Sequence, residues 1–214
     1  MPKELFYSID SEKQSKILEA AMQEFSSQLY VNSSINQIIK QADISRGSFY
    51  QYFEDKDDLY YYIIDITVKN TAYRYIKEFV SKKPEDIFSV YQAMFDYNLK
   101  LLSDSTYQRF FRTLYLSMSY RLQQELKRIF STIRNEMLQG QLKELQQMSG
   151  CDPVTFQELM SLLELNNRDL LMQYISEEMD EQSIRTLYQI RLQILKGNTK
   201  NHGRTGNTGI EGNE

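Results

Sequence analysis

The sequence predicts an all-α protein, and three observations support this fold class. Turn-forming residues are scarce before Lys196, whereas folds rich in strands need them often. The only glycines and prolines there are Gly47, Gly140, Gly150, Pro2, Pro84 and Pro153. Apolar residues also recur at helical spacing, as in Ile35, Ile38, Ile39 and Ala42, which fit the i, i+3, i+4, i+7 pattern of one helix face. Finally, helix start and stop signals fall between the apolar segments, as in Asp152-Pro153 directly after Gly150.

The apolar periodicity predicts nine helices along the chain. They span residues 11–27, 34–41, 45–52, 56–80, 84–102, 106–118, 121–148, 153–177 and 181–196. Ser34, Ser45 and Asp55 are suited to cap the second, third and fourth of them, and Pro84 suits the first turn of the fifth. Residues 197–214 contain five glycines and almost nothing apolar, so we expect a disordered tail there.

Composition narrows the functional classes. The only histidine is His202 and the only cysteine is Cys151, so the chain has no His/Cys cluster for zinc, and it has no glycine-rich loop for phosphates. We therefore expect no enzyme, no cofactor and no metal site. A single cysteine fits a reducing compartment, and neither a signal peptide nor a run of about 20 apolar residues is present. The expected location is the cytoplasm.

The overall charge does not favour DNA binding. The formal net charge is −4, and residues 1–56 carry six basic against eight acidic side chains. A generic nucleic-acid binder has the opposite balance. Two functional classes therefore stay open: a DNA-binding regulator, and a helical module that binds a ligand or a protein but not DNA.

Residues 34–53 have the layout of a helix-turn-helix motif. Two short predicted helices are joined by a tight turn, and in this motif the second helix enters the major groove of DNA. Ile38 gives the first helix a buried face, and Phe49 and Phe53, four residues apart, give the second one a narrow buried stripe. We therefore expect the second helix to turn its other side outward.

The expected outward face carries groups that suit DNA. Gly47 lets the backbone approach a groove wall, and Ser48 and Gln51 can bond base edges. Tyr50 and Tyr52 can donate hydroxyls to phosphates. The expected contacts at the edges are Arg46, Lys56 with the backbone amides that open the fourth helix, and Ser33 with Ser34 at the start of the second helix.

Residues 11–60 resemble the N-terminal domain of the TetR/AcrR family of bacterial regulators. The matching segments are ILEAAMQEF, SSINQIIKQADIS and SRGSFYQYFEDKDDL, and together they cover about a quarter of the chain. Asp43 departs from the family, which usually has a turn glycine there, but Asp tolerates the left-handed conformation better than most residues. The resemblance places at the DNA-facing positions Ser33, Ser34, Arg46, Gly47, Ser48, Tyr50, Gln51, Tyr52 and Lys56.

The resemblance also implies a domain plan: a helix-turn-helix domain over 1–55, and a helical effector-binding and dimerisation domain over 56–196. The partners implied are a palindromic operator, a small effector and a second copy of the chain, bound through 153–196. Wide apolar coverage of the last two helices agrees with the second copy. Aromatic residues crowd 60–120, and few charges lie among the candidates for an apolar effector pocket, which are Tyr62, Tyr91, Phe95, Phe111 and Tyr115.

Overall fold

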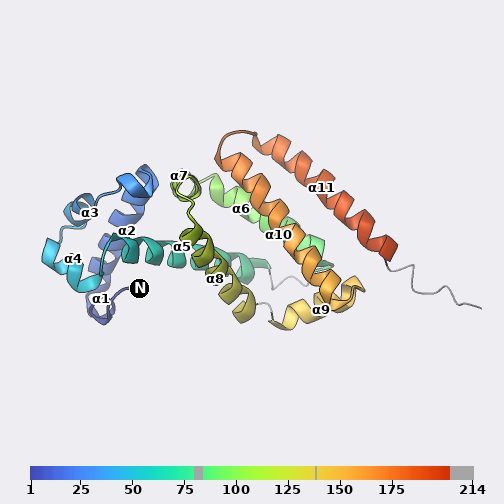
Figure 1. Ribbon diagram of the computed structural model, residues 1–214, viewed down its shortest axis with the longest axis horizontal. Helices are drawn as coiled ribbons and strands as arrows, with labels where there is room; N and C mark the ends of the chain where they lie inside the picture. The colour runs from blue at the N-terminus through green and yellow to red at the C-terminus, as the bar shows by residue number, and fades with distance from the viewer. Residues whose placement is uncertain (80–83, 138, 203–214) are drawn as a thin grey trace, which may run out of the picture. The chain divides into compact units, whose positions relative to one another are not determined.

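The computed structural model describes residues 1–79, 84–137 and 139–202. The elements in these ranges are all helical (Figure 1). They are α1 (Glu4–Ser8), α2 (Ser11–Ser27), the 3-10 helix η1 (Tyr30–Asn32), α3 (Ile35–Gln41), α4 (Arg46–Tyr52), α5 (Lys56–Phe79), α6 (Ile87–Leu102), α7 (Ser105–Leu116), α8 (Tyr120–Met137), α9 (Gln139–Ser149), α10 (Pro153–Ile175) and α11 (Glu181–His202). Among the described residues, no helix combines the length and the apolar character needed to cross a membrane.

The all-α prediction is confirmed, and most predicted helices agree with the structure to within a few residues. Two short elements, α1 and η1, were not predicted, because segments of five and three residues carry no measurable periodicity. Within the helix predicted over 121–148, the structure describes α8 up to Met137 and α9 from Gln139, and residue 138 between them lies outside the described residues.

Two predicted helix boundaries are also wrong. Helix α6 begins at Ile87 and not at Pro84, and Asp86 caps it by accepting from the Ser89 amide at 2.7 Å. Helix α11 continues to His202, so residues 197–202 of the predicted disordered tail are helical. Extending an existing helix costs less than starting one, which lets α11 run into a polar sequence. Residues 203–214 lie outside the described residues.

The chain divides into two compact units. The N-terminal unit comprises Met1–Lys77 and Lys100–Met137, and the C-terminal unit comprises Glu78–Leu99 and Leu138–Glu214. This division differs from the expected domains 1–55 and 56–196, because most of α5, together with α7 and α8, belongs with the N-terminal helices. Helix α7 packs on α2, and the Thr113 hydroxyl of α7 donates to the Phe25 carbonyl at 2.6 Å.

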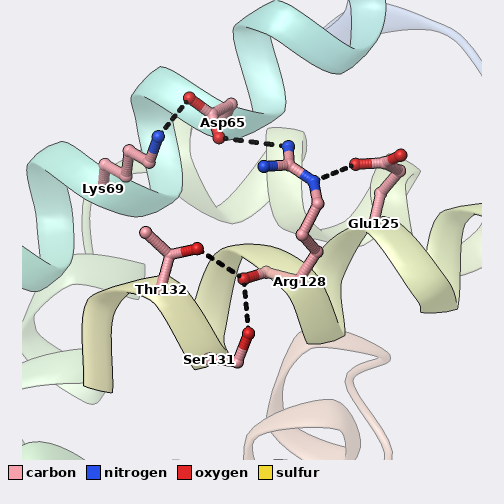
Figure 2. A network of polar contacts seen from close by, with 6 residues as sticks. All are labelled: Asp65, Lys69, Glu125, Arg128, Ser131 and Thr132. Atoms are coloured by element: carbon pink, nitrogen blue, oxygen red, sulfur yellow. Dashed lines mark hydrogen bonds and ion pairs between the residues drawn. The ribbon is translucent and has the colours of Figure 1, made fainter. Parts of the chain in front are cut away.

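A buried carboxylate links α5 to α8 inside the N-terminal unit (Figure 2). Asp65 of α5 is only 4% exposed. Lys69, one turn along α5, donates to it at 2.8 Å, and Arg128 of α8 lies 3.6 Å from its other oxygen. Arg128 also donates to Glu125 at 2.9 Å. The buried charge is thus compensated by two cations from two helices, as burial of a carboxylate requires.

The C-terminal unit is a separate helical core. Helices α10 and α11 lie side by side in it (Figure 1). Phe95 of α6 stacks on Tyr188 of α11 with 3.9 Å between ring centroids, and both residues are fully buried. The Asn167 amide of α10 donates to the Tyr91 carbonyl of α6 at 3.3 Å. These contacts join α6 to both C-terminal helices.

Candidate nucleic-acid interface

The turn between α3 and α4 is set by Asp43. This residue has a positive φ of 52°, and the Ile44 amide donates back to the Ile39 carbonyl at 3.1 Å. The pattern is a Schellman motif, in which a left-handed residue after the helix lets the chain satisfy the last carbonyls. The structure confirms that Asp43 keeps the turn that a glycine would otherwise make.

Helix α4 starts at a capped end and is fixed by aromatic burial. The Ser45 hydroxyl accepts from the Ser48 amide at 3.0 Å, as expected of an N-cap. Phe49 and Phe53 are both fully buried, also as expected, and their rings lie 5.6 Å apart. Together, the Ser45 cap and the buried rings of Phe49 and Phe53 fix the orientation of α4 within the N-terminal unit.

The outward face of α4 consists of Arg46, Gly47, Tyr50 and Gln51, all exposed, with Ser48 half-buried at its edge. These positions follow the spacing i, i+1, i+4, i+5, which is one stripe of a helix. The Ser48 hydroxyl lies 2.9 Å from the Ser45 hydroxyl. The stripe presents one guanidinium, one phenol, one amide and a patch of bare backbone.

Tyr52 does not belong to this outward face. It was expected to flank the face, but it is only 4% exposed. The reason is helical geometry, because Tyr52 is three residues after Phe49 and residues at i and i+3 share a side. Its ring packs edge-on against Phe6, and the Lys13 ammonium lies 5.7 Å from its centroid. Tyr52 therefore packs in the core beside Phe49 and not on the outward face of α4.

Arg46 bridges the two helices of the motif. Its guanidinium donates to the Asn36 side chain of α3 at 2.8 Å and to the Tyr50 hydroxyl at 3.3 Å. It also lies 5.6 Å from the centroid of the Tyr50 ring. Because both Arg46 and Tyr50 are exposed, these contacts order the two side chains while leaving the surface open to a phosphate or a base.

Ser33, Ser34 and Lys56 meet at the start of α3, but they are more enclosed than expected. Ser33 is 6% exposed, and its hydroxyl donates to the Tyr30 carbonyl at 2.7 Å. The Ser34 side chain makes no capping bond to α3. Lys56 is half-buried and donates to the carbonyls of Tyr30 and Ser33 at 2.8 and 3.0 Å. Burial lowers the pKa of Lys56, and nearby Glu24 acts in the opposite direction.

Carboxylates already accept from two backbone amides near the start of α5, where the phosphate clamp is expected. Asp55 caps α5 as predicted, with its carboxylate accepting from the Asp58 amide at 2.8 Å. Asp58 in turn accepts from the Glu54 amide at 3.1 Å. An anion gains less at an amide that already donates to a carboxylate. A phosphate contact by Lys56 and the first amides of α5 stays a prediction.

The five aromatic candidates for an effector pocket fall in both compact units. Tyr91 and Phe95 belong to the C-terminal unit, where the Tyr91 hydroxyl donates to Glu164 at 3.2 Å. Tyr62, Phe111 and Tyr115 belong to the N-terminal unit. The Tyr62 ring lies 5.9 Å from Phe6 and 6.5 Å from Phe53, and burial raises its pKa to about 12. Tyr62 therefore packs in the aromatic core behind the helix-turn-helix motif.

Three further residues support the interface and were not predicted from the sequence. Glu24 is 4% exposed and accepts from the Ser34 amide at 2.8 Å. The Tyr30 ring lies 4.3 Å below the Lys56 ammonium, and the Tyr30 amide donates to the Ser117 hydroxyl at 3.2 Å. Lys3 donates to the Tyr50 carbonyl at 2.9 Å. Sequence periodicity carries no signal for any of these contacts, because each joins different elements.

Comparison with protein families gives two matches along the chain. Residues 17–63 match the model of the bacterial regulatory proteins of the tetR family. Residues 86–197 match the model of the tetracyclin repressor-like C-terminal domain. The first match includes the whole of α3 and α4, and the second covers just over half of the chain.

Individual relatives are also regulators. The chain is 42% identical over 67 residues to the HTH-type transcriptional regulator HbdR of Aromatoleum sp. strain CIB, covering 31% of this chain and 28% of that protein. It is 32% identical over 96 residues to an HTH-type regulator of Staphylococcus aureus strain USA300, covering 44% and 50%. The chain thus spans half or less of the length of these curated relatives.

A solved structure shares the fold over most of the chain. The regulator FadR of Bacillus subtilis, crystallised in complex with stearoyl-CoA, superposes with a TM-score of 0.66 at 19% identity. The superposition covers 85% of this chain and 96% of that one. At this identity the likeness concerns the fold.

Proposed function

This chain belongs to the TetR family of bacterial regulatory proteins, which are DNA-binding transcriptional regulators and not enzymes, and we propose that it is a repressor released from a palindromic operator by a small apolar ligand. The observation that supports contact with operator DNA is the outward stripe of α4. Arg46, Gly47, Tyr50 and Gln51 are exposed, whereas every other side of the helix is buried, half-buried or capped.

Each residue of the stripe has a proposed role in the major groove. Gln51 bonds one adenine edge in two places, and Arg46 bonds a guanine or a phosphate. Tyr50 donates to a phosphate, and Ser48 assists from the edge of the stripe. Lys56 places its charge beside the carbonyls of Tyr30 and Ser33, where a second phosphate would lie. Tyr52 is left out of the contact set because it is buried.

Gly47 supplies the clearest support for close approach to a ligand. A methyl group added to Gly47 would meet only the Ser45 hydroxyl, at 3.7 Å, which is an ordinary contact. The protein itself therefore has room for a side chain at this position. A glycine in the middle of the first turn lowers helix stability, so its presence is explained by something outside the protein that comes close to the backbone.

We propose that the partner copy binds on α10 and α11. Leu162 and Leu165 of α10, and Ile190 and Ile194 of α11, are 48–59% exposed. An open pocket at the start of α11 is lined by Met179, Leu187 and Ile190 among others. A twofold dimer built on this apolar face would present two recognition helices about 34–36 Å apart, or a multiple of that distance.

The effector is proposed to be apolar because the candidate residues in each unit are aromatic: Tyr91 and Phe95 in the C-terminal unit, and Phe111 and Tyr115 in the N-terminal unit. A stearoyl-CoA complex of the structurally similar B. subtilis regulator agrees with an acyl chain as one ligand class. Palmitoyl-CoA and stearoyl-CoA are the probes to use, with free CoA as the control. Release of operator DNA by the acyl-CoAs but not by CoA would support the proposal. Unchanged operator affinity at saturating acyl-CoA would remove this ligand class.

The main experiment is selection of bound sequences from random DNA, using the full-length chain. We expect an inverted repeat, and an affinity that falls steeply with added salt. The Tyr50→Ala variant should weaken binding to all sequences alike. An absence of any sequence preference in the wild-type chain would favour the alternative, a helical ligand-binding or protein-binding module that does not recognise DNA.

The dimer face is tested separately. Ile190→Glu should convert the dimer to a monomer in sedimentation and weaken operator binding. Gln157→Glu, on another exposed side of α10, should change neither. A dimer that survives both Ile190→Glu and Leu162→Glu would exclude this face.

A further inference from the structure

The C-terminal end of the recognition helix is held by the first residues of the chain. Helix α4 ends at Tyr52, and the last four carbonyls of a helix have no partner inside it. The Lys3 backbone amide donates to the Tyr52 carbonyl at 2.8 Å, and the Lys3 ammonium donates to the Tyr50 carbonyl at 2.9 Å. The Phe53 amide donates to the Phe49 carbonyl at 2.9 Å. Lys3 therefore satisfies two of the four terminal carbonyls of α4, and it places a positive charge where the helix dipole is negative.

Burial of Phe6 anchors this contact. Phe6 is fully buried, and its ring centroid lies 4.9 Å from that of Phe53 and 6.2 Å from that of Tyr52. Pro2 is buried as well. Helix α1 packs directly against α4. Removing Phe6 from water stabilises the docking of α1 by an apolar contact, so Lys3 is brought to α4 by a buried side chain and does not depend on one exposed hydrogen bond.

We propose that residues 2–8 form a clasp on the recognition helix, in which Lys3 is a positioning residue for operator binding. The clasp holds Tyr50 and Tyr52 by their carbonyls, and Gln51 lies between them. The base-reading amide of Gln51 is therefore fixed through its backbone by a segment that lies outside the outward stripe of α4. This inference rests on the proposed DNA-binding function. It concerns residues before the region 17–63 that matches the family model.

A positioning role is distinguishable from direct contact with DNA. A lysine that neutralises a phosphate contributes about 0.9 to the slope of log affinity against log salt concentration. A lysine that orders α4 contributes nothing to that slope, but it contributes to discrimination between operator and random DNA. It also slows amide exchange at the end of α4 when no DNA is present.

The test uses Lys3→Met in the full-length chain, which keeps the length of the side chain and removes the donor and the charge. The matched control is Lys16→Met, because Lys16 is an exposed lysine of α2 whose ammonium pairs with Glu12 at 2.7 Å and makes no hydrogen bond to α4 that matches those of Lys3. In Lys3→Met we expect amide exchange at Tyr52 and Phe53 to quicken about fivefold, the size of one lost hydrogen bond. We also expect the operator affinity of Lys3→Met to fall about fivefold, with an unchanged salt slope. Lys16→Met should show neither faster amide exchange in α4 nor a loss of discrimination between operator and random DNA.

A second variant, Phe6→Leu, weakens the clasp without changing Lys3. Phe6→Leu keeps an apolar anchor of smaller size, and it should change exchange and discrimination in the same direction as Lys3→Met. Unchanged exchange in both variants would overturn the clasp. A salt slope reduced by about 0.9 in Lys3→Met would also overturn it, because Lys3 would then be a phosphate contact. If the wild-type chain shows no operator preference, the DNA-binding proposal fails, while the exchange measurement still decides whether Lys3 orders α4.

Discussion

The helix-turn-helix segment and the C-terminal unit are both helical, but they are held together over very different sequence distances. In the first, the Ile44–Ile39 and Ser48–Ser45 hydrogen bonds join residues five and three apart. In the second, the Asn167–Tyr91 and Gln189–Gln92 hydrogen bonds join residues 76 and 97 apart. Geometry encoded by neighbours can be inferred from a short motif, whereas geometry encoded by distant pairs cannot. The turn and the cap of the helix-turn-helix segment are therefore predictable from the sequence, whereas the packing of the C-terminal unit is not.

The largest expected effect comes from breaking the core of one unit at a time. Phe49→Ala and Phe95→Ala each remove a fully buried ring, which typically lowers the free energy of unfolding by about 3–5 kcal/mol. We expect Phe49→Ala to raise amide exchange mainly in the N-terminal unit and Phe95→Ala mainly in the C-terminal unit. Hydrogen exchange with mass spectrometry measures this, and equal loss of protection across the chain in both variants would contradict two separable units.

The next largest effect is expected at Gly47, where one substitution should change folding stability and DNA affinity in opposite directions. Gly47→Ala should raise helix stability by about 0.5–1 kcal/mol, because alanine is the better helix former and the added methyl has room. The same methyl should lower operator affinity at least tenfold by holding the backbone away from the groove wall. Thermal melting measures the change in stability, and operator titration measures the change in affinity. An operator affinity equal to that of the wild type would exclude close approach of DNA at Gly47.

The contacts that support the interface show where sequence reasoning stops. The Schellman turn at Asp43, the Ser45 cap and the buried Phe49 and Phe53 could all be predicted, because local spacing specifies them. Tyr52 was wrongly placed beside the outward face, because the predicted buried stripe contained only Phe49 and Phe53 and left out the residue three positions after Phe49. Lys3 could not be found from the sequence, since its contacts cross about 50 residues of chain.

A smaller effect is expected at the link between α5 and α8. Asp65→Asn removes the buried charge but leaves Lys69 and Arg128 facing a neutral amide. We expect a loss of about 1–2 kcal/mol in unfolding free energy, since a hydrogen bond to a charged group is weakened and both cations reach solvent. Chemical denaturation measures the loss. The control is Glu125→Gln, at the half-buried end of the same network, which should change the free energy of unfolding by about 0.5 kcal/mol or less.

The smallest effect is expected at the turn. Asp43→Gly relieves a left-handed backbone at φ 52° and removes one negative charge from the motif. Stability should rise by a few tenths of a kcal/mol, up to about 1, and operator affinity should rise by about twofold. Asp43→Val, a branched residue in the same conformation, should lower stability. If Asp43→Val were as stable as the wild type, the turn would not depend on the residue at this position.

The central claim is that the outward stripe of α4 reads bases, and Gln51 tests it most directly. The base preference of Gln51→Ala should be compared with that of the wild-type chain by selection from random DNA. We predict that one position in each half-site loses its preference while the others keep theirs, with a loss of about 1–3 kcal/mol on the preferred operator. An equal loss of affinity for every sequence, with all base preferences retained, would contradict base reading by this face.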